Sequence, residues 1–361
     1  MNDKVTLMKG NEALAMAMIR YGADGYFGYP ITPQSEVLEK LEEEMPWETT
    51  GMVVLQAESE VAAINMVYGG AMTGKAVCTS TSSPGFSLMQ EGVSYLAASE
   101  VPALLINVQR GGPGLGTIHA SQADYFQACK GGGHGDYHMI VLAPSSVQEM
   151  ADMVALGFDL AFKYRCVSMI LADGTIGQLM EKVVLPEQRP RRTDDEIRQQ
   201  CPWAVNGRKG MRPSNVVTSL ELDDDKMEEN NWRFQACYRE IEKNETRCEL
   251  IDVEDCDYLI TAFGTTARVA MKTMELARAE GIKVGMFRPI TLWPFPEKQL
   301  REAAKNVKGI LCVELNAGQM VEDVKLAVEC KMPVEHYGRF GGNVPTPDEL
   351  LKVLKEKLIN K

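Results

Sequence analysis

The sequence predicts an α/β protein with two domains, the first of them a parallel sheet covered by helices on both faces. Short β-branched or apolar runs alternate with segments of helical spacing in the first half of the chain. The same alternation begins again after a charge-dense interruption and continues to the C-terminus. Strands that alternate with helices in this way are typical of parallel sheets, whose strands are buried on both faces.

The elements of the first domain, residues 1–185, follow from the spacing of their apolar residues. Helical spacing over residues 11–23 predicts a helix, and residues 25–30 form a short strand pattern that ends in a proline turn. Helical spacing resumes at Ser35, and an apolar run begins at Val53. Further strands are expected at 76–81, 103–109 and 166–173, with helices at 87–100 and 146–164.

Residues 186–250 break this pattern, because they are rich in proline at the start and dense in charges of both signs throughout. Such composition predicts a charged linker that carries one exposed helix. Strand and helix patterns return at residues 251–361. This stretch is long enough for a second, smaller α/β domain of roughly a hundred residues.

Charge and hydropathy exclude two classes of protein. The chain has 361 residues, with 38 basic and 50 acidic side chains and a net charge of -12. The acidic surplus is spread along the chain, so the basic patch of a nucleic-acid-binding protein is missing. The chain has no run of about 18 apolar residues, and its N-terminus lacks the pattern of a signal peptide. We therefore expect a cytoplasmic protein that binds neither nucleic acid nor membrane.

The cysteines and histidines offer little support for a metal site. Nine cysteines lie far apart without a C-x-x-C pair, so they are expected to be reduced and mostly buried thiols. Among four histidines, the one pattern with metal-ligand types is His134, Asp136 and His138 in a glycine-rich stretch. The glycines favour an ordinary loop over a metal site there.

Four segments at the expected carboxyl ends of strands carry unusual chemistry, and open α/β sheets bind their ligands at that edge. Two prolines hold a rigid turn around Thr32, and Glu60 opens a helix that Ser59 could cap. Residues 79–83 present five hydroxyl side chains in succession, and Arg110 precedes four glycines in six residues. Because all four fall at one edge of one sheet, together they indicate a ligand site.

Each of these segments also has a simpler interpretation. An acid in the first turn of a helix, such as Glu60, is commonly there because the helix dipole favours it. The glycines after Arg110 do not match the G-x-G-x-x-G fingerprint of dinucleotide sites, and the hydroxyl run could serve only turn formation. The occurrence of all four segments at one edge favours the site over these separate explanations.

At these residues the chain resembles the α subunit of the thiamine-diphosphate-dependent 2-oxoacid:ferredoxin oxidoreductases. Five ordered motifs carry the resemblance: "GYPITPQSE", "QAESEVAAINMVYGGAMTG", "SSPGFSLMQEGVSYLAASEVP", "NVQRGGPGLG" and "KGGGHGDYHMIVLAP". The second domain adds "FRPITLWPFP" and "GRFGGNVPTPDEL", so the resemblance covers most of the chain except the linker. Within the family, the chain resembles the branched-chain (3-methyl-2-oxobutanoate) enzymes most and the 2-oxoglutarate enzymes next.

The resemblance implies a fold and roles for particular residues. The first domain would be the pyrimidine-binding half of a thiamine diphosphate site, followed by a transketolase-C-terminal-like domain. The glutamate that matches Glu60 hydrogen-bonds N1′ of the cofactor's aminopyrimidine and so takes part in catalysis, which leaves Glu58 as a solvated or capping acid. The resemblance makes Thr32 and Arg110 contacts of the substrate carboxylate and places His134 in the same cavity. Further cofactor contacts are implied at Pro30, Ile31, Ser83, Pro84 and Gly85.

The resemblance also implies an activity that needs partner subunits. Thiamine enzymes hold magnesium and the diphosphate with a G-D-G motif and a later Asn, and this chain has neither that motif nor cluster ligands. A β subunit is therefore expected to complete the cofactor site and carry Mg²⁺. A γ subunit and a small ferredoxin-like subunit are also expected, with the [4Fe-4S] clusters on partner subunits.

The implied reaction is oxidative decarboxylation of a branched-chain 2-oxoacid to its acyl-coenzyme A, with electrons passed to ferredoxin. Two alternatives stay open: a 2-oxoglutarate:ferredoxin oxidoreductase α subunit, and a scaffold subunit that does no chemistry. The presence of Thr32, Glu60 and Arg110 at the positions that the family motifs require favours a catalytic subunit, because a scaffold subunit has no need of all three.

Overall fold

The computed structural model describes residues 5–208 and 212–360, and its largest sheet has seven strands in the order β12-β6-β7-β5-β4-β2-β3. All neighbouring strands are parallel except β12, which pairs antiparallel with β6. Every residue of β4, β5 and β7 is buried, as expected of a sheet covered on both faces. The strands are β2 (Gly25–Gly28), β3 (Val53–Gln56), β4 (Val77–Thr81), β5 (Ala103–Gln109), β6 (Ile140–Leu142), β7 (Val167–Asp173) and β12 (Thr291–Trp293).

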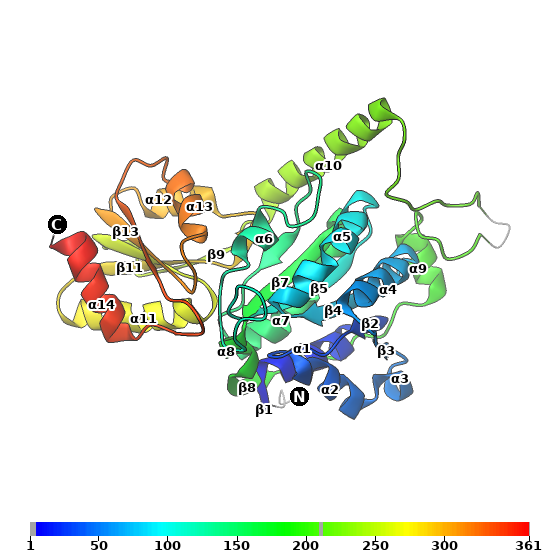
Figure 1. The fold of residues 1–361 in the computed structure, drawn as a ribbon, viewed down its shortest axis with the longest axis horizontal. Coiled ribbons are helices and arrows are strands. Elements are labelled where there is room, and N and C mark those ends of the chain that lie inside the picture. Colours follow the sequence, from blue (N-terminus) through cyan, green and yellow to red (C-terminus); the bar gives the residue numbers. More distant parts are fainter. Residues whose placement is uncertain (1–4, 209–211, 361) are drawn as a thin grey trace.

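The helices around this sheet form two packed groups (Figure 1). Helix α1 packs on α2 and α7, and α4 packs on α5. The helices are α1 (Gly10–Tyr21), α2 (Ser35–Glu44), α3 (Pro46–Thr49), α4 (Glu60–Met72), α5 (Ser83–Ala98), α6 (Tyr125–Cys129), α7 (Val147–Tyr164) and α8 (Gly174–Gln178). The predicted strands and helices of the first domain are therefore confirmed, apart from small shifts at their ends.

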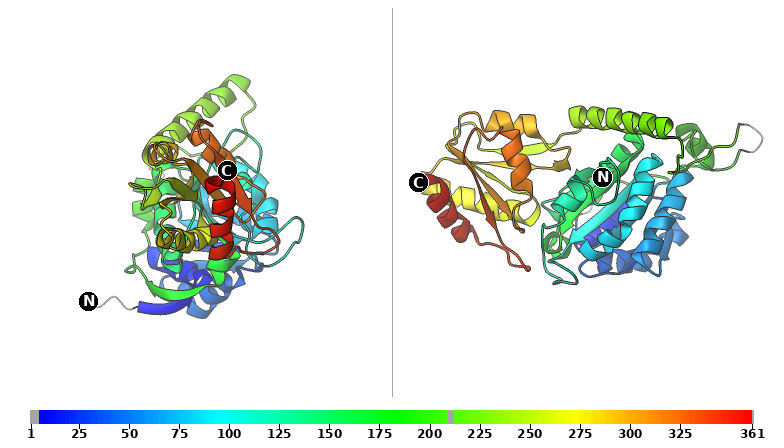
Figure 2. Two further views of the ribbon diagram at one scale, coloured as in Figure 1. Left: turned by 90° about the vertical axis from the view of Figure 1, so that its left-hand side faces the viewer. Right: turned by 45° about the horizontal axis from the view of Figure 1, so that its top comes forward.

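A second sheet of five strands has the order β14-β13-β10-β11-β9 and is parallel except for β9. Figure 2 shows it as a separate layer beside the first domain, with helices packed on it. Its strands are β9 (Cys248–Ile251), β10 (Tyr258–Thr261), β11 (Val284–Pro289), β13 (Gly309–Glu314) and β14 (Val334–Gly338). Its helices are α11 (Gly264–Ala279), α12 (Glu297–Ala303), α13 (Met320–Ala327) and α14 (Pro347–Leu354), which continues into a π-helical turn at Lys355–Ile359.

Two features of the sheets were not predicted from the sequence. Strands β1 (Val5–Lys9) and β8 (Met180–Val184) pair antiparallel in a sheet of their own. Strand β12 lies between β11 and β13 in the chain, yet it joins the edge of the first sheet rather than the second. A strand that comes from the second part of the chain therefore forms one edge of the first domain's sheet.

The segment between the domains holds two helices, whereas the sequence predicted one exposed helix. Helix α9 (Asp194–Gln200) buries Ile197, and α10 (Asp224–Asn244) buries Phe234, Tyr238 and Ile241 on one side. Figure 1 shows α10 running along the first domain. Helix α9 was missed because its short sequence is mostly charged and has a single buried apolar residue. The boundaries at residues 185 and 250 stay a prediction.

Buried polar contacts join the two domains. Arg288 of β11 is 4% exposed and donates to both carboxylate oxygens of Glu149 on α7, at 2.6 and 2.9 Å, and to Glu249 at 2.7 Å. Asp173, at the end of β7, accepts from the backbone and hydroxyl of Thr265 at 2.9 and 2.5 Å. A charge-assisted contact of this kind is stronger than a neutral one, so these pairs hold the domains in a defined orientation.

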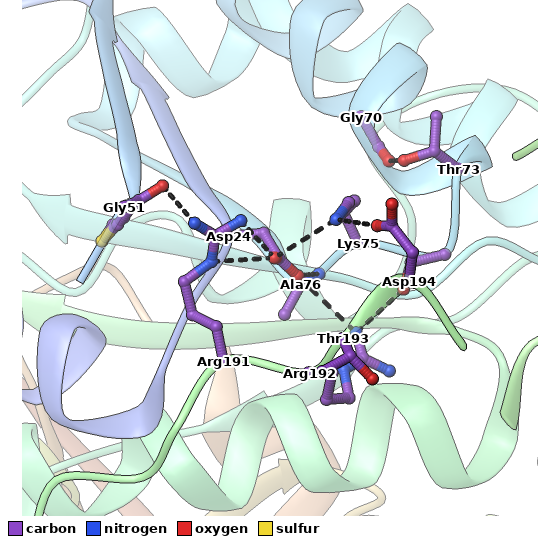
Figure 3. A network of polar contacts seen from close by, with 12 residues as sticks. Asp24, Gly51, Gly70, Thr73, Lys75, Ala76, Arg191, Arg192, Thr193 and Asp194 are labelled. Atoms are coloured by element: carbon purple, nitrogen blue, oxygen red, sulfur yellow. Dashed lines mark hydrogen bonds and ion pairs between the residues drawn. The ribbon is translucent and has the colours of Figure 1, made fainter. Parts of the chain in front are cut away.

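Asp24 fastens the segment after the first domain to the sheet (Figure 3). The Asp24 side chain is buried, and it accepts from Arg191 Nη2 at 2.9 Å and from the Ala76 backbone at 2.8 Å. Arg191 also donates to the backbone of Gly51, and Lys75 lies 3.8 Å from the Asp24 carboxylate. The buried acid is thus fully surrounded by donors, as a buried charge requires.

We predict that Asp24→Ala lowers the free energy of unfolding by about 2–3 kcal/mol, because Arg191 and the Ala76 N–H lose their partner. The matched control is Glu229→Ala on exposed α10, which should change stability by less than about 0.5 kcal/mol. Thermal unfolding followed by circular dichroism measures both. Equal midpoints for the two variants would contradict the role given to Asp24.

Candidate active site

A cavity of about 750 Å³ lies between the first and second domains. The start of α5 and the loop after β5 line it on one side, and the loops after β13 and β14 line the other. The side chains that line it include Ser83, Arg110, Asp124, Phe126, Leu315 and Phe340. The carboxyl ends of parallel strands therefore meet a wall from the second domain, as ligand sites of open α/β sheets require.

Arg110 directly follows β5 and is 9% exposed. Its Nη1 donates to the backbone oxygen of Thr32 at 2.8 Å, and its buried Nε has no hydrogen-bond partner among the described residues. Within residues 5–208 and 212–360, no carboxylate lies within ion-pairing distance of Arg110. A buried guanidinium without an acid is unfavourable, so this side chain is suited to bind an anion.

The structure brings Thr32 and Arg110 together, as the sequence indicated. Thr32 lies in the turn between β2 and α2, it is exposed, and its peptide bond to Pro33 is cis. Arg110 donates to the backbone oxygen of Thr32 and not to the Thr32 hydroxyl. Pro30 and Ile31 lie on the same turn.

The acidic pair before α4 has two different environments. Glu58 is exposed and accepts from the Ser59 hydroxyl at 2.9 Å. Ser59 caps α4 by accepting from the Ala62 N–H, which confirms the expected cap. Glu60 is 6% exposed, and among the described residues no hydrogen bond reaches its carboxylate. Burial of an unpaired acid is costly unless a ligand supplies the missing donor.

Gly85 makes room for the Glu60 carboxylate. A Cβ at position 85 would lie 2.7 Å from Glu60 Oε1, and it would also collide with the Thr81 hydroxyl. The buried Thr81 hydroxyl has no hydrogen-bond partner in the described part of the chain. The carboxylate of Glu60 and the hydroxyl of Thr81 thus both lie beside the first turn of α5, and neither has a hydrogen-bond partner among the described residues. A polar ring that carries donors and acceptors could supply both partners.

Asp124 lines the cavity and Asn107 contacts Asp124, and neither residue was predicted from the sequence. Asp124 Oδ2 accepts from Ser83 Oγ at 2.6 Å and from Asn107 Nδ2 at 2.9 Å. Burial raises the pKa of Asp124, while these two hydrogen bonds oppose the rise. Asn107 and Gln109 are the two amides in the otherwise apolar strand pattern of residues 103–109, which is a signal in the sequence. Asp124 gives no such signal, because it resembles an ordinary acid before a helix.

His134 does not line the cavity of Arg110. It is exposed, and it lines another cavity of about 420 Å³ together with Tyr95, Tyr137 and Phe234. Its contact with substrate stays a prediction. Nearby, His138 stacks on Trp293 with ring centroids 4.5 Å apart, and burial lowers the pKa of His138.

The described residues give no further metal or membrane signal. Over residues 5–208 and 212–360, no three His, Cys, Asp or Glu side chains gather as metal ligands. In the same part of the chain, no helix combines the length and apolar character needed to span a bilayer. All nine cysteines are free thiols, and six of them are buried.

Comparison with protein families gives two matches in order. Residues 16–244 match the family described as pyruvate flavodoxin/ferredoxin oxidoreductase, thiamine diP-bdg. Residues 256–350 match pyruvate:ferredoxin oxidoreductase core domain II. The two matches leave out only the ends of the chain and a short stretch before β10.

Individual relatives extend over nearly the whole chain. The ketoisovalerate oxidoreductase subunit VorB of Methanothermobacter marburgensis is 47% identical over 97% of this chain and 97% of its own length. The 2-oxoglutarate synthase subunit KorA of the same organism is 35% identical over 95% of this chain and 96% of its own length. The chain thus matches nearly the full length of both subunits, and its sequence is more similar to VorB than to KorA.

Solved structures agree with the fold. A 2-oxoglutarate:ferredoxin oxidoreductase from Magnetococcus marinus, with 2-oxoglutarate, coenzyme A and succinyl-CoA bound, matches 98% of this chain with a TM-score of 0.84 and 28% identity. This chain spans 65% of the length of that one. A split-gene transketolase matches with a TM-score of 0.60 at 13% identity, which concerns the fold alone. The predicted fold, a thiamine-diphosphate-binding domain followed by a smaller transketolase-like domain, is confirmed.

We predict that Gly85→Ala disturbs the site, because the new methyl group would have to displace Glu60 or Thr81. Such overpacking should lower the free energy of unfolding by about 1–3 kcal/mol. Gly69→Ala in the middle of α4 is the matched control, since a Cβ there meets nothing within 4 Å. That change should stabilise the helix by up to about 1 kcal/mol. Denaturant titration of both variants distinguishes them, and a neutral Gly85→Ala would contradict the tight packing.

Proposed function

Because the chain belongs to the pyruvate flavodoxin/ferredoxin oxidoreductase family, we propose that it is the α subunit of a 2-oxoacid:ferredoxin oxidoreductase for branched-chain 2-oxoacids. The preferred substrate in this proposal is 3-methyl-2-oxobutanoate. Oxidative decarboxylation would give the acyl-coenzyme A, and ferredoxin would take the electrons. The VorB relatives, named for ketoisovalerate, support this choice of substrate.

The observation that carries the proposal is the buried, unpaired guanidinium of Arg110 in the cavity between the domains. Every 2-oxoacid brings a carboxylate that such a guanidinium can bind with two parallel hydrogen bonds. Among the described residues that line the cavity, Arg110 is the only basic one. The distal carboxylate of 2-oxoglutarate would find no cation of this chain there, whereas Phe126, Leu315 and Phe340 offer apolar walls to a branched side chain.

The site also fits the cofactor of the family. Glu60 and Thr81 offer a buried acid and a buried hydroxyl without partners among the described residues, and Gly85 keeps the space beside them open. We assign Glu60 as the residue that would hold the aminopyrimidine ring, with Pro30, Ile31, Ser83, Pro84 and Gly85 as further contacts. When bound, thiamine diphosphate supplies a nucleophilic carbon for the 2-oxo group and accepts the electron pair that decarboxylation releases.

The residues of this chain would then divide the work. The Glu60 carboxylate would hold the ring through a hydrogen bond and take up a proton there, which is general acid–base chemistry in a water-poor site. Arg110 binds the substrate carboxylate and orients the 2-oxo carbon. The contact between Arg110 and the Thr32 backbone fixes where that carboxylate lies.

In this proposal, partner subunits complete the enzyme. The chain lacks a G-D-G motif with a later Asn, so a β subunit would hold Mg²⁺ and the diphosphate. The [4Fe-4S] clusters would lie on partner subunits, with a γ subunit and a small ferredoxin-like subunit in a cytoplasmic complex. Phe340 lines the cavity and is an exposed apolar side chain, and a partner would remove it from water.

Glu60→Gln in the complex reconstituted with its partner subunits should keep the fold and lose at least about a hundredfold in activity, because Gln cannot take up the proton. Glu58→Gln is the matched control on the exposed member of the pair, and it should remain active. Rates of viologen reduction with 3-methyl-2-oxobutanoate measure both. Equal activity of the two variants would contradict the assignment of Glu60.

Arg110→Ala should lower kcat/KM by similar factors for 3-methyl-2-oxobutanoate, 4-methyl-2-oxopentanoate and pyruvate, because the carboxylate is common to all three. Loss of a charge-assisted contact of about 1.5–3 kcal/mol corresponds to roughly a ten- to more than a hundredfold decrease. The unmodified complex should prefer the branched acids over 2-oxoglutarate. A preference for 2-oxoglutarate, or an effect on one acid alone, would contradict the substrate proposed.

A further inference from the structure

We propose that Asp124 is a positioning residue that fixes Arg110 for the substrate carboxylate by acting through the hydroxyl of Ser83. The inference rests on the function proposed above, since it concerns the binding of 2-oxoacids. Asp124 and Ser83 both line the cavity that Arg110 lines. Neither of them needs to touch the substrate to have this effect.

Ser83 is joined to Arg110 through the backbone on both sides of that residue. The Arg110 N–H donates to Ser83 Oγ at 3.0 Å, and the Arg110 carbonyl oxygen lies 3.2 Å from the same hydroxyl. Asp124 Oδ2 lies 2.6 Å from Ser83 Oγ, which is the shortest of the three contacts. The hydroxyl of Ser83 therefore lies between the backbone of Arg110 and the carboxylate of Asp124.

The chemistry of the groups sets the direction of these hydrogen bonds. A hydroxyl has one proton to donate, and an ionised carboxylate can only accept. Ser83 therefore donates to Asp124 and keeps a lone pair for the Arg110 N–H. Asp124 thus fixes the rotation of the Ser83 hydroxyl, and through it the backbone at which the Arg110 side chain begins.

Asp124 is itself held so that it does not pair with Arg110. Asn107 Nδ2 donates to the same carboxylate oxygen at 2.9 Å, and the Asp124 N–H donates to Gln109 Oε1 at 3.1 Å. No ion pair forms between Asp124 and Arg110 in the described residues, although both line one cavity. Two neutral donors hold one oxygen of the acid, and the guanidinium remains available for a substrate carboxylate.

The position of Asp124 is also tied to the second domain. Two residues before it, Gln122 Nε2 donates to the Phe263 backbone oxygen at 2.6 Å, and Gln122 Oε1 accepts from the Leu315 N–H at 3.0 Å. Leu315 lines the same cavity. The second domain therefore fixes both one wall of the cavity and the segment that carries Asp124.

The experiment measures KM and kcat of Asp124→Ala in the reconstituted complex with several 2-oxoacids. Asp124→Ala should raise KM about tenfold for all acids alike and leave kcat within about twofold, because a positioning hydrogen bond of ordinary strength is lost near the carboxylate site. Asp124→Asn keeps an acceptor for Ser83 and Asn107 and should retain most of the affinity. Asp152→Ala on the exposed surface of α7 is the control and should change neither constant.

A double-mutant cycle with Arg110→Ala gives the decisive readout. If Asp124 acts through Arg110, then Asp124→Ala should have little further effect on KM once the guanidinium is gone. Additive effects of the two changes, or an Asp124→Ala complex with unchanged KM, would overturn the inference. An unmodified complex that turns over none of the acids would instead contradict the proposed function, so the two failures can be told apart.

Discussion

A buried charge needs a partner, and the site of this protein depends on two buried charges of opposite sign that lack one in the described part of the chain. Glu60 opens α4 after β3, and Arg110 follows β5. The start of α5 lies between them: Gly85 makes room for the Glu60 carboxylate, and the Ser83 hydroxyl binds the Arg110 backbone. The first turn of α5 thus positions both the acid and the guanidinium. Each of these charges can then pair with a ligand.

The second domain matters because it closes the cavity that Arg110 lines. Buried polar contacts, among them Arg288 with Glu149 and Asp173 with Thr265, fix its orientation on the first domain. The loop after β13 can then present Leu315 to the cavity. The size of this cavity is therefore a property of the interface, whereas Arg110 and Ser83 come from the strand ends of the first domain.

The sequence predicted most of the fold, and it predicted a candidate site, for a physical reason. Buried parallel strands are short apolar runs, and polar side chains directly after them must lie at one edge, which made Thr32, Glu60 and Arg110 the predicted site residues. Strand β12 was missed because three residues carry no clear period, and its pairing with the first sheet is a tertiary contact. Asp124 was missed for the same reason, since its role depends on Ser83, far away in the chain.

The most direct test of this account is a structure of the complex reconstituted with its partner subunits and thiamine diphosphate. The account predicts that the aminopyrimidine ring lies beside Gly85, with a ring nitrogen within hydrogen-bonding distance of the Glu60 carboxylate. A ring bound elsewhere, with Glu60 paired to a donor of the protein, would contradict it.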